Sequence, residues 1–182
     1  MRRVGLLLLL LALASGCFGR GAPPQRGTLY SPNGEPLSGG RLGHPACEDA
    51  IGRWFDRVDA THAGAIDRSE FLADANRQFA AMDLDKDGEI TPAELAQYRA
   101  PYTDAPALQE EATTEDGERR RGLRPPATAR ERADPVMLAD TGLHNRVTRA
   151  EFLAYASRTF AGLDTDHDGR LTRDKLTRAC KN

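Results

Sequence analysis

The sequence predicts an all-α fold of helix–loop–helix repeats arranged in two halves. Apolar residues recur every three or four positions on both sides of acidic loops, as they do on one face of a helix. The loops form two pairs, residues 59–70 with 83–94 and residues 140–151 with 164–175, and the separation within each pair is the same. With 182 residues, of which 40% are hydrophobic, the chain can form a modest core. The net charge of -2 gives no general attraction to nucleic acid, so no nucleic-acid partner is expected.

Residues 1–16 are predicted to be a signal peptide. Arg2 and Arg3 give a positively charged start, and Leu6–Leu13 form an apolar segment that is too short to span a bilayer by itself. Small residues follow at positions 14–16, as a peptidase site requires. We therefore expect the chain to be exported from the cytoplasm.

Cys17 follows this segment directly. The stretch from Ala14 to Cys17 resembles a bacterial lipoprotein signal, although Ala14 stands where Leu is commonest. The resemblance implies that Cys17 is the lipidation site and that the chain is anchored to a membrane on the periplasmic side of the cell envelope. Ordinary secretion with an unmodified Cys17 is the alternative.

Residues 17–46 are predicted to be an arm or tether. The segment is dense in Gly and Pro, which neither a helix nor a central strand tolerates well. We expect an extended segment that lies on the surface, with Leu29, Tyr30 and Leu37 as its docking residues.

The most complete acidic loop is DLDKDGEITPAE, residues 83–94. A twelve-residue loop can wrap a hard cation with side chains at positions 1, 3 and 5, a backbone carbonyl at position 7 and a bidentate Glu at position 12. Gly88 stands at position 6, where the chain turns with a positive φ, and Thr91 at position 9 can hold a water. The stretch resembles an EF-hand calcium loop. The resemblance implies Ca²⁺ as the cofactor, held by Asp83, Asp85, Asp87, Glu89 through its carbonyl, and Glu94.

The other loops keep this frame with fewer ligands, and we number all four in chain order as loops 1 to 4. Loop 4, DTDHDGRLTRDK, retains three predicted metal ligands but has Lys175 at the closing position. Those ligands are Asp164, Asp166 and Asp168.

Loops 1 and 3 also depart from the full ligand set. Loop 1, DATHAGAIDRSE, is predicted to be a weaker metal site with the ligands Asp59, Thr61, Asp67 and Glu70. Loop 3 lacks side-chain oxygens at Gly142 and His144 and has Asn145 in place of the turn glycine, so we expect it to be empty.

Apolar stripes predict the helices that flank these loops. Residues 71–82 separate loops 1 and 2 and give about 18 Å of helix, so one helix must both leave loop 1 and enter loop 2. The segment between loops 3 and 4 repeats its apolar pattern. We therefore place EF-hand repeats 1 and 2 in residues 47–100, and repeats 3 and 4 in residues 136–182.

The EF-hand resemblance also implies short β-bridges between loops at their apolar anchor residues. Pairing between the halves, for example loop 1 with loop 4, is one hypothesis, because it would bring the helix after Cys47 against the helix before Cys180. An oxidising compartment favours a disulfide between these two residues, which could add about 4 to 5 kcal/mol in the chain-entropy model. Two free thiols are the alternative.

Residues 101–135 are predicted to be a charged, Pro-rich linker that need not fold. Its arginine-rich block suits either contact with anionic lipid or an acidic partner, or simple solvation, with the charge balanced by nearby acids. Solvation is the plainer interpretation.

No enzymatic activity is expected. The four His residues lie in the arm or inside the loops, and neither an HExxH nor a GxSxG pattern occurs. Two functions stay open at this point. The first is a calcium-binding envelope lipoprotein that acts as a sensor or a calcium-stiffened binding module for an envelope protein partner. The second is a structural envelope lipoprotein that uses a largely degenerate EF-hand scaffold for protein contacts.

Overall fold

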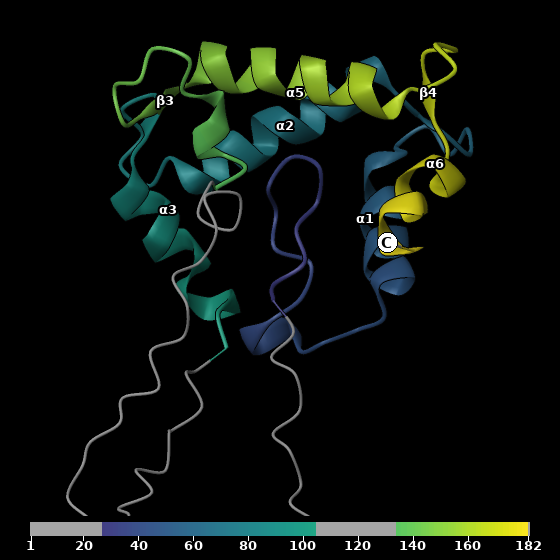
Figure 1. Cartoon of the computed structure of the whole chain (residues 1–182), viewed down its shortest axis with the longest axis horizontal. Coiled ribbons are helices and arrows are strands. Elements are labelled where there is room, and N and C mark those ends of the chain that lie inside the picture. The colour runs from purple at the N-terminus through teal and green to yellow at the C-terminus, as the bar shows by residue number, and fades with distance from the viewer. Residues whose placement is uncertain (1–26, 105–133, 182) are drawn as a thin grey trace, which may run out of the picture.

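The computed structural model describes residues 27–104 and 134–181 (Figure 1). The predicted signal peptide, Cys17 and most of the predicted linker lie outside these ranges. The helices of the described part are α1 (Cys47–Val58), α2 (Arg68–Met82), α3 (Pro92–Arg99), α5 (Arg149–Leu163) and α6 (Arg173–Thr177). The strands are β1 (Ile66–Asp67), β2 (Glu89–Ile90), β3 (Val147–Thr148) and β4 (Arg170–Leu171). Short 3-10 turns are η1 (Gly40–Leu42), η2 (Ala100–Tyr102), η3 (Met137–Ala139) and η4 (Arg178–Lys181). This part is mostly helical, as predicted.

The two long helices, α2 and α5, pack against each other and run side by side (Figure 1). Their matching apolar stripes meet in reverse order. Phe71, near the start of α2, contacts Phe160 near the end of α5 edge to face, and the ring centroids are 5.5 Å apart. Phe79, near the end of α2, lies 5.7 Å from Phe152 near the start of α5. The helices are therefore antiparallel, and their aromatic residues form the centre of the core.

The β-bridges join loops of different halves, as the cross-pairing hypothesis requires. β1 of loop 1 pairs antiparallel with β4 of loop 4, with Ile66 opposite Leu171. β2 of loop 2 pairs antiparallel with β3 of loop 3, with Ile90 opposite Val147. All four anchor residues are completely buried. Loops 1 and 4 thus form one end of the molecule, and loops 2 and 3 form the other.

A disulfide joins the first helix to the C-terminal turn, on the side of the molecule that contains loops 1 and 4. Cys47 at the start of α1 is bonded to Cys180 in η4, and the two Cα atoms are 5.7 Å apart. Helices α1 and α6 pack together beside this bond (Figure 1). This is the cysteine pair that the sequence predicts.

The second half departs from the expected order of helix, loop, helix, loop, helix. Within the described residues, loop 3 is preceded by the short turn η3 rather than by a full helix. Pro135 disfavours helical geometry at Asp134, and the Asp134 Oδ1 atom instead accepts a hydrogen bond from the Val136 N–H at 2.8 Å.

The described part of the arm is packed more closely than an extended surface segment would be. Residues 28–43 double back on themselves below α2, between α1 and α3, with a β-bridge from Tyr30 to Pro36 (Figure 1). Asn33 is buried, and its Nδ2 atom donates hydrogen bonds to the Asp74 Oδ2 atom at 2.8 Å and to the Phe71 carbonyl at 3.2 Å.

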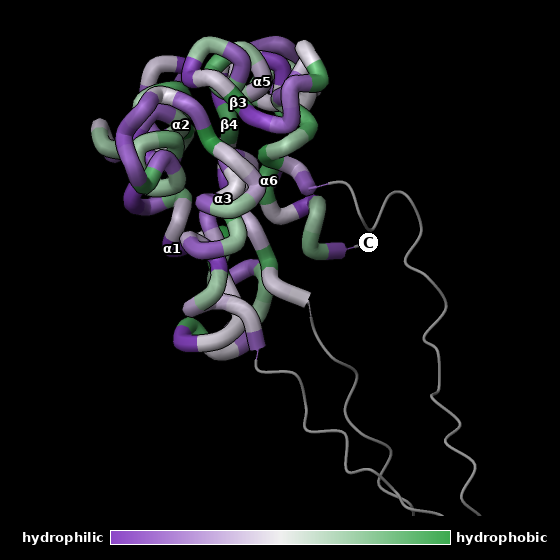
Figure 2. Tube along the Cα trace, turned by 90° about the vertical axis from the view of Figure 1, so that its left-hand side faces the viewer, coloured by the Kyte–Doolittle hydropathy of each residue, from purple (hydrophilic) through white to green (hydrophobic). Residues whose placement is uncertain are grey.

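Hydrophobic and hydrophilic residues are interspersed along the chain in Figure 2, as amphipathic helices require. Among the described residues, none of the helices has both the length and the apolar character needed to cross a bilayer.

Candidate metal centre

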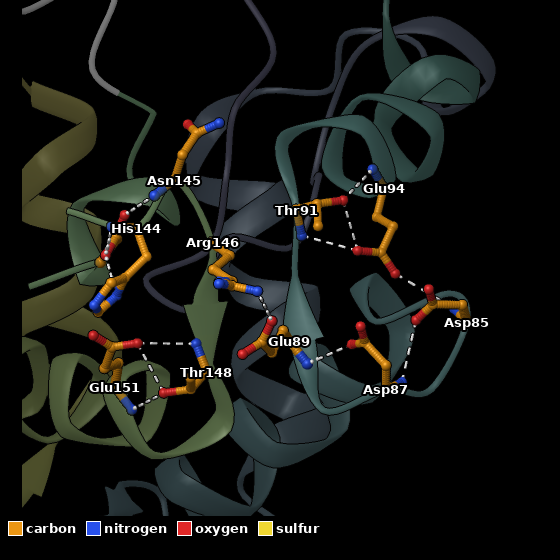
Figure 3. Close-up of polar contacts among 11 residues, drawn as sticks. Asp85, Asp87, Glu89, Thr91, Glu94, His144, Asn145, Arg146, Thr148 and Glu151 are labelled. Carbon is orange, nitrogen blue, oxygen red and sulfur yellow. Dashed lines mark hydrogen bonds and ion pairs between the residues drawn. The ribbon is translucent and has the colours of Figure 1, made fainter. Parts of the chain in front are cut away.

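Loop 2 brings its three aspartates together. One carboxylate oxygen from each of Asp83, Asp85 and Asp87 lies within 4.8 Å of the others. The loop's own backbone holds them in place. The Gly88 N–H donates to Asp83 Oδ2 at 3.1 Å, and the Asp87 N–H donates to Asp85 Oδ1 at 3.1 Å. The Glu89 N–H donates to Asp87 Oδ1 at 2.8 Å (Figure 3). Gly88 has a φ of 88°, which glycine adopts without the steric cost of a Cβ.

One oxygen of this cluster lacks a partner. Asp83 is buried, and its Oδ1 atom accepts no hydrogen bond. A buried acceptor without a partner costs roughly 1 to 3 kcal/mol, and more when it is charged. A cation held by this loop would satisfy that oxygen and would relieve the repulsion among the three carboxylates. The residues of loop 2 therefore fit Ca²⁺.

Glu94 reaches from α3 back across the loop. Its Oε2 atom accepts hydrogen bonds from the Thr91 N–H at 2.9 Å and the Thr91 hydroxyl at 2.8 Å, and its Oε1 atom accepts one from the Leu84 N–H at 2.9 Å. The backbone N–H of Thr91 is the main cause that lowers the pKa of Glu94 below its usual 4.5. Glu94 is thus held as a carboxylate at the closing position.

Thr91 has a structural role beside the predicted water-bridging one. Its hydroxyl caps α3 by accepting a hydrogen bond from the Glu94 N–H, while Glu94 bonds back to Thr91 (Figure 3). This is a capping box, which satisfies N–H groups that the first helical turn leaves free. The pattern TPAE, with Thr three residues before Glu, carries the signal in the sequence.

Loop 3 lies beside loop 2 and contains a cluster that sequence reasoning missed. Asp140, His144 and Glu151 each place a possible ligand atom within 4.8 Å of the other two. These carboxylates already have hydrogen bonds. Asp140 accepts from the N–H groups of His144 at 3.1 Å and Asn145 at 2.7 Å, and Glu151 accepts from the Thr148 N–H at 3.0 Å and hydroxyl at 2.8 Å (Figure 3). The sequence feature that could have indicated this cluster is His144 at position 5 of the loop.

Hydrogen bonds from Thr148, first from its backbone N–H, lower the pKa of Glu151 to about 2. An ion pair between Arg146 and Glu89, 3.0 Å long, links loop 3 to loop 2. The Glu89 side chain therefore faces loop 3, which leaves its carbonyl for the role predicted at position 7.

The residues of the weaker predicted site in loop 1 bond within their own loop. Asp59 accepts from the N–H groups of Ala63 and Gly64, both at 2.9 Å. Glu70 accepts from the Thr61 N–H at 3.0 Å and from the Thr61 hydroxyl at 2.9 Å. Asp67 caps α2 by accepting from the Glu70 N–H. Within the described residues, Asp59, Asp67 and Glu70 do not form one of the carboxylate clusters that could hold a metal ion.

Loop 4 brings Asp164, Asp166 and Asp168 together as predicted, with oxygens within 4.8 Å of one another. The Lys175 ammonium lies among them. Its Nζ atom donates to Asp164 Oδ1 at 3.0 Å, to Asp168 Oδ1 at 2.7 Å and also to Asp166 Oδ1. The hydrogen bond from Lys175 is the main cause that lowers the pKa of Asp166 to about 2. The three carboxylates that were predicted to be metal ligands are therefore bonded to a side chain of the protein itself.

A family model described as EF hand matches residues 75–97. The match covers the second part of α2, all of loop 2 and most of α3. The comparison with curated proteins gives no match, and neither does the comparison with solved structures. The matched segment contains the one loop with a complete ligand set, so an EF-hand protein is the class that the fold and the site support. An EF hand implies calcium binding.

Proposed function

We propose that this protein is an exported, calcium-stiffened EF-hand lipoprotein that binds one Ca²⁺ in loop 2 and has no enzymatic activity. The observation that supports this most directly is the unpartnered, buried Asp83 Oδ1 atom beside Asp85 and Asp87. Asp83, Asp85, Asp87, Glu94 and the Glu89 carbonyl would hold the ion. Bound calcium supplies a concentrated positive charge at the point where the three aspartates meet.

Stiffening, rather than a large opening motion, fits the packing around the site. The loop 2 carboxylates are already gathered, β2 is already paired with β3, and the arm packs against α2. A bound ion then has little to rearrange and mainly favours the folded state by mass action. A structural lipoprotein with no calcium requirement is the competing function, and the sparse ligand sets of loops 1 and 3 favour it.

Export, the lipid anchor at Cys17 and the periplasmic location belong to the same proposal. They are supported by the apolar leader that ends at Cys17 and by the Cys47–Cys180 disulfide, which is typical of oxidising compartments. Incorporation of labelled palmitate into the wild type, but not into Cys17→Ser, is the expected result. Equal labelling of both chains would contradict the anchor.

The calcium site is tested by isothermal titration of the soluble chain, in which Cys17→Ser removes the anchor. We expect one ion to bind in loop 2 with a dissociation constant of about 10⁻⁴ to 10⁻³ M, the range of extracellular modules. Glu94→Gln should abolish most of this binding heat. At 10 mM calcium, the free energy of unfolding should rise by about 1 to 3 kcal/mol in the wild type.

Glu89→Gln is the matched control, because it makes the same charge change in the same loop. The Glu89 side chain faces Arg146 while its carbonyl is the proposed ligand, so this variant should keep calcium binding. Wild-type protein that neither binds calcium nor becomes more stable with it would leave the structural function standing instead. A large calcium-dependent change in circular dichroism would favour a sensor over a stiffened module.

A further inference from the structure

The Lys175 side chain has an environment unlike that of the other described lysines. Lys86 and Lys181 are exposed, whereas the Lys175 side chain is only 5% exposed. Its Nζ atom contacts four oxygens: Asp164 Oδ1 at 3.0 Å, Asp168 Oδ1 at 2.7 Å, the Arg170 carbonyl at 2.7 Å, and Asp166 Oδ1. An ammonium group has three protons to donate, so this is a crowded, cation-filled centre rather than a single surface ion pair.

These four oxygens occupy loop positions 1, 3, 5 and 7. They are the positions from which an EF-hand loop supplies side-chain and carbonyl ligands to its ion. Lys175 itself stands at position 12, where loop 2 has the closing Glu94. The substitution therefore removes the closing ligand and places a positive charge at the point toward which the remaining ligands converge.

The surrounding backbone is the same as in the calcium-type loop. The Gly169 N–H donates to Asp164 Oδ2 at 2.9 Å, as the Gly88 N–H does to Asp83 Oδ2 at 3.1 Å. Gly169 has a φ of 75° and Gly88 a φ of 88°. The first aspartate of the two loops differs in its partner: Asp83 Oδ1 has none, whereas Asp164 Oδ1 accepts from Lys175.

We propose that the Lys175 ammonium is a tethered cation that takes the place of calcium in loop 4. Loop 4 is then closed without metal, and the β1–β4 bridge and the Cys47–Cys180 disulfide hold the same end of the molecule. Where the calcium site proposed for loop 2 also holds, the response to calcium is confined to the end formed by loops 2 and 3.

The decisive variant is Lys175→Glu, which converts loop 4 into DTDHDGRLTRDE with a ligand at every required position. Prepared in calcium, this variant should bind one more Ca²⁺ per chain than the wild type in isothermal titration. Lys181→Glu makes the same charge change at an exposed site and should leave the stoichiometry unchanged. An unchanged stoichiometry in Lys175→Glu would overturn the proposal.

The wild type provides a second readout that needs no variant. In a calcium titration followed by amide NMR, the Gly169 resonance should stay in place, because Asp164 is already neutralised by Lys175. A Gly169 resonance that shifts to saturation would show metal in loop 4 and would contradict the proposal.

Lys175→Met tests the holding role directly. In chelator, it should lower the thermal midpoint relative to Lys181→Met, since three convergent carboxylates lose their cation, and millimolar calcium should recover part of the loss. Equal midpoints would contradict the proposal. If the wild type binds no calcium at all, the function proposed for loop 2 fails, while the extra ion in Lys175→Glu would still support the role of Lys175.

Discussion

At the residue scale, the four loops share one backbone conformation although their ligands differ. Position 6 has a positive φ in every loop, through Gly64, Gly88, Asn145 and Gly169. Position 4 also has a positive φ in every loop, through His62, Lys86, Leu143 and His167. The turn at position 6 was predictable, because Gly and Asn mark it in the sequence. The one at position 4 was not, since Lys and Leu rarely adopt this conformation and a His does not mark it as Gly does.

Leu143 is the least suited of these residues to its conformation. It has a φ of 57°, in the left-handed region, and it is 88% exposed, so little burial of apolar surface offsets the steric cost of this backbone conformation. Asn tolerates this region better than a bulky apolar residue does. We therefore expect Leu143→Asn to raise the free energy of unfolding by about 0.5 to 1 kcal/mol in urea denaturation. Leu138→Asn is the comparison, because Leu138 is also exposed but has no positive φ, and it should change stability by less. A destabilised Leu143→Asn would show that the side chain has a role in loop 3.

At the scale of the element, the end of each loop is also the start of a helix. Loop position 9 is the N-cap and position 12 is the third helical residue, so Asp67, Thr91 and Thr148 each form a capping box with a following Glu. In loop 4, Thr172 caps α6 but Lys175 cannot return the bond. These pairs are visible in the sequence, but the calcium-loop pattern led to the prediction that Thr91 holds a water and that Asp67 is a metal ligand. The same loop positions can serve both metal binding and helix capping, so a pattern for metal binding does not reveal the caps.

The capping box of α5 predicts a pH dependence. Thr148 lowers the pKa of Glu151 to about 2, below its usual 4.5. A depressed pKa stabilises the fold above the unfolded-state value, and this stabilisation disappears as pH falls through the folded-state value. Measured in chelator, Glu151→Gln should therefore be less stable than the wild type at pH 7, and the difference should shrink between about pH 4.5 and pH 2. Urea denaturation at several pH values in this window measures it. A difference that does not change with pH would mean that the Glu151 charge has no part in the cap.

At the scale of the whole molecule, residues 27–104 and residues 134–181 are joined by contacts at both ends. Loops 1 and 2 of the first range pair with loops 4 and 3 of the second, and α2 packs antiparallel on α5. The pairing of loop 1 with loop 4 could be suggested from the sequence for two reasons. Loops 1 and 2 lie at opposite ends of the helix that they share, and a bond between Cys47 and Cys180 would link the first helix to the last. The sequence could not locate the arm, because Gly- and Pro-rich segments carry no periodic pattern. Position 12 of loop 4 indicates that the charge of Lys175 lies near the three aspartates, but it does not fix which oxygens the Nζ atom of so long a side chain contacts.

The arm's contact with the core gives the last prediction. Asp74 is buried in α2 and accepts hydrogen bonds from Asn33 Nδ2 at 2.8 Å, from Trp54 Nε1 at 3.2 Å and from Arg77. Removing a donor to a buried carboxylate costs roughly 1 to 3 kcal/mol, so Asn33→Ala should lower the free energy of unfolding by about that amount. Trp54 is the single tryptophan of the chain, and its fluorescence reports the change.

Asn33→Asp sharpens this test, because it keeps the shape of the side chain and sets a second carboxylate against Asp74. Like charges at hydrogen-bond distance repel, so this variant should be less stable at pH 7 than Asn33→Ala. Protonation of one carboxyl group supplies a donor again, so Asn33→Asp should recover relative to Asn33→Ala as the pH falls toward about 4. Asn76→Ala removes the same side-chain type from the outer part of α2, where it bonds to Leu72 of the same helix and to Arg149, and it should cost less. If Asn33→Ala and Asn33→Asp both matched the wild type at every pH, the arm would contribute nothing to the fold, and residues 28–43 would be a tether after all.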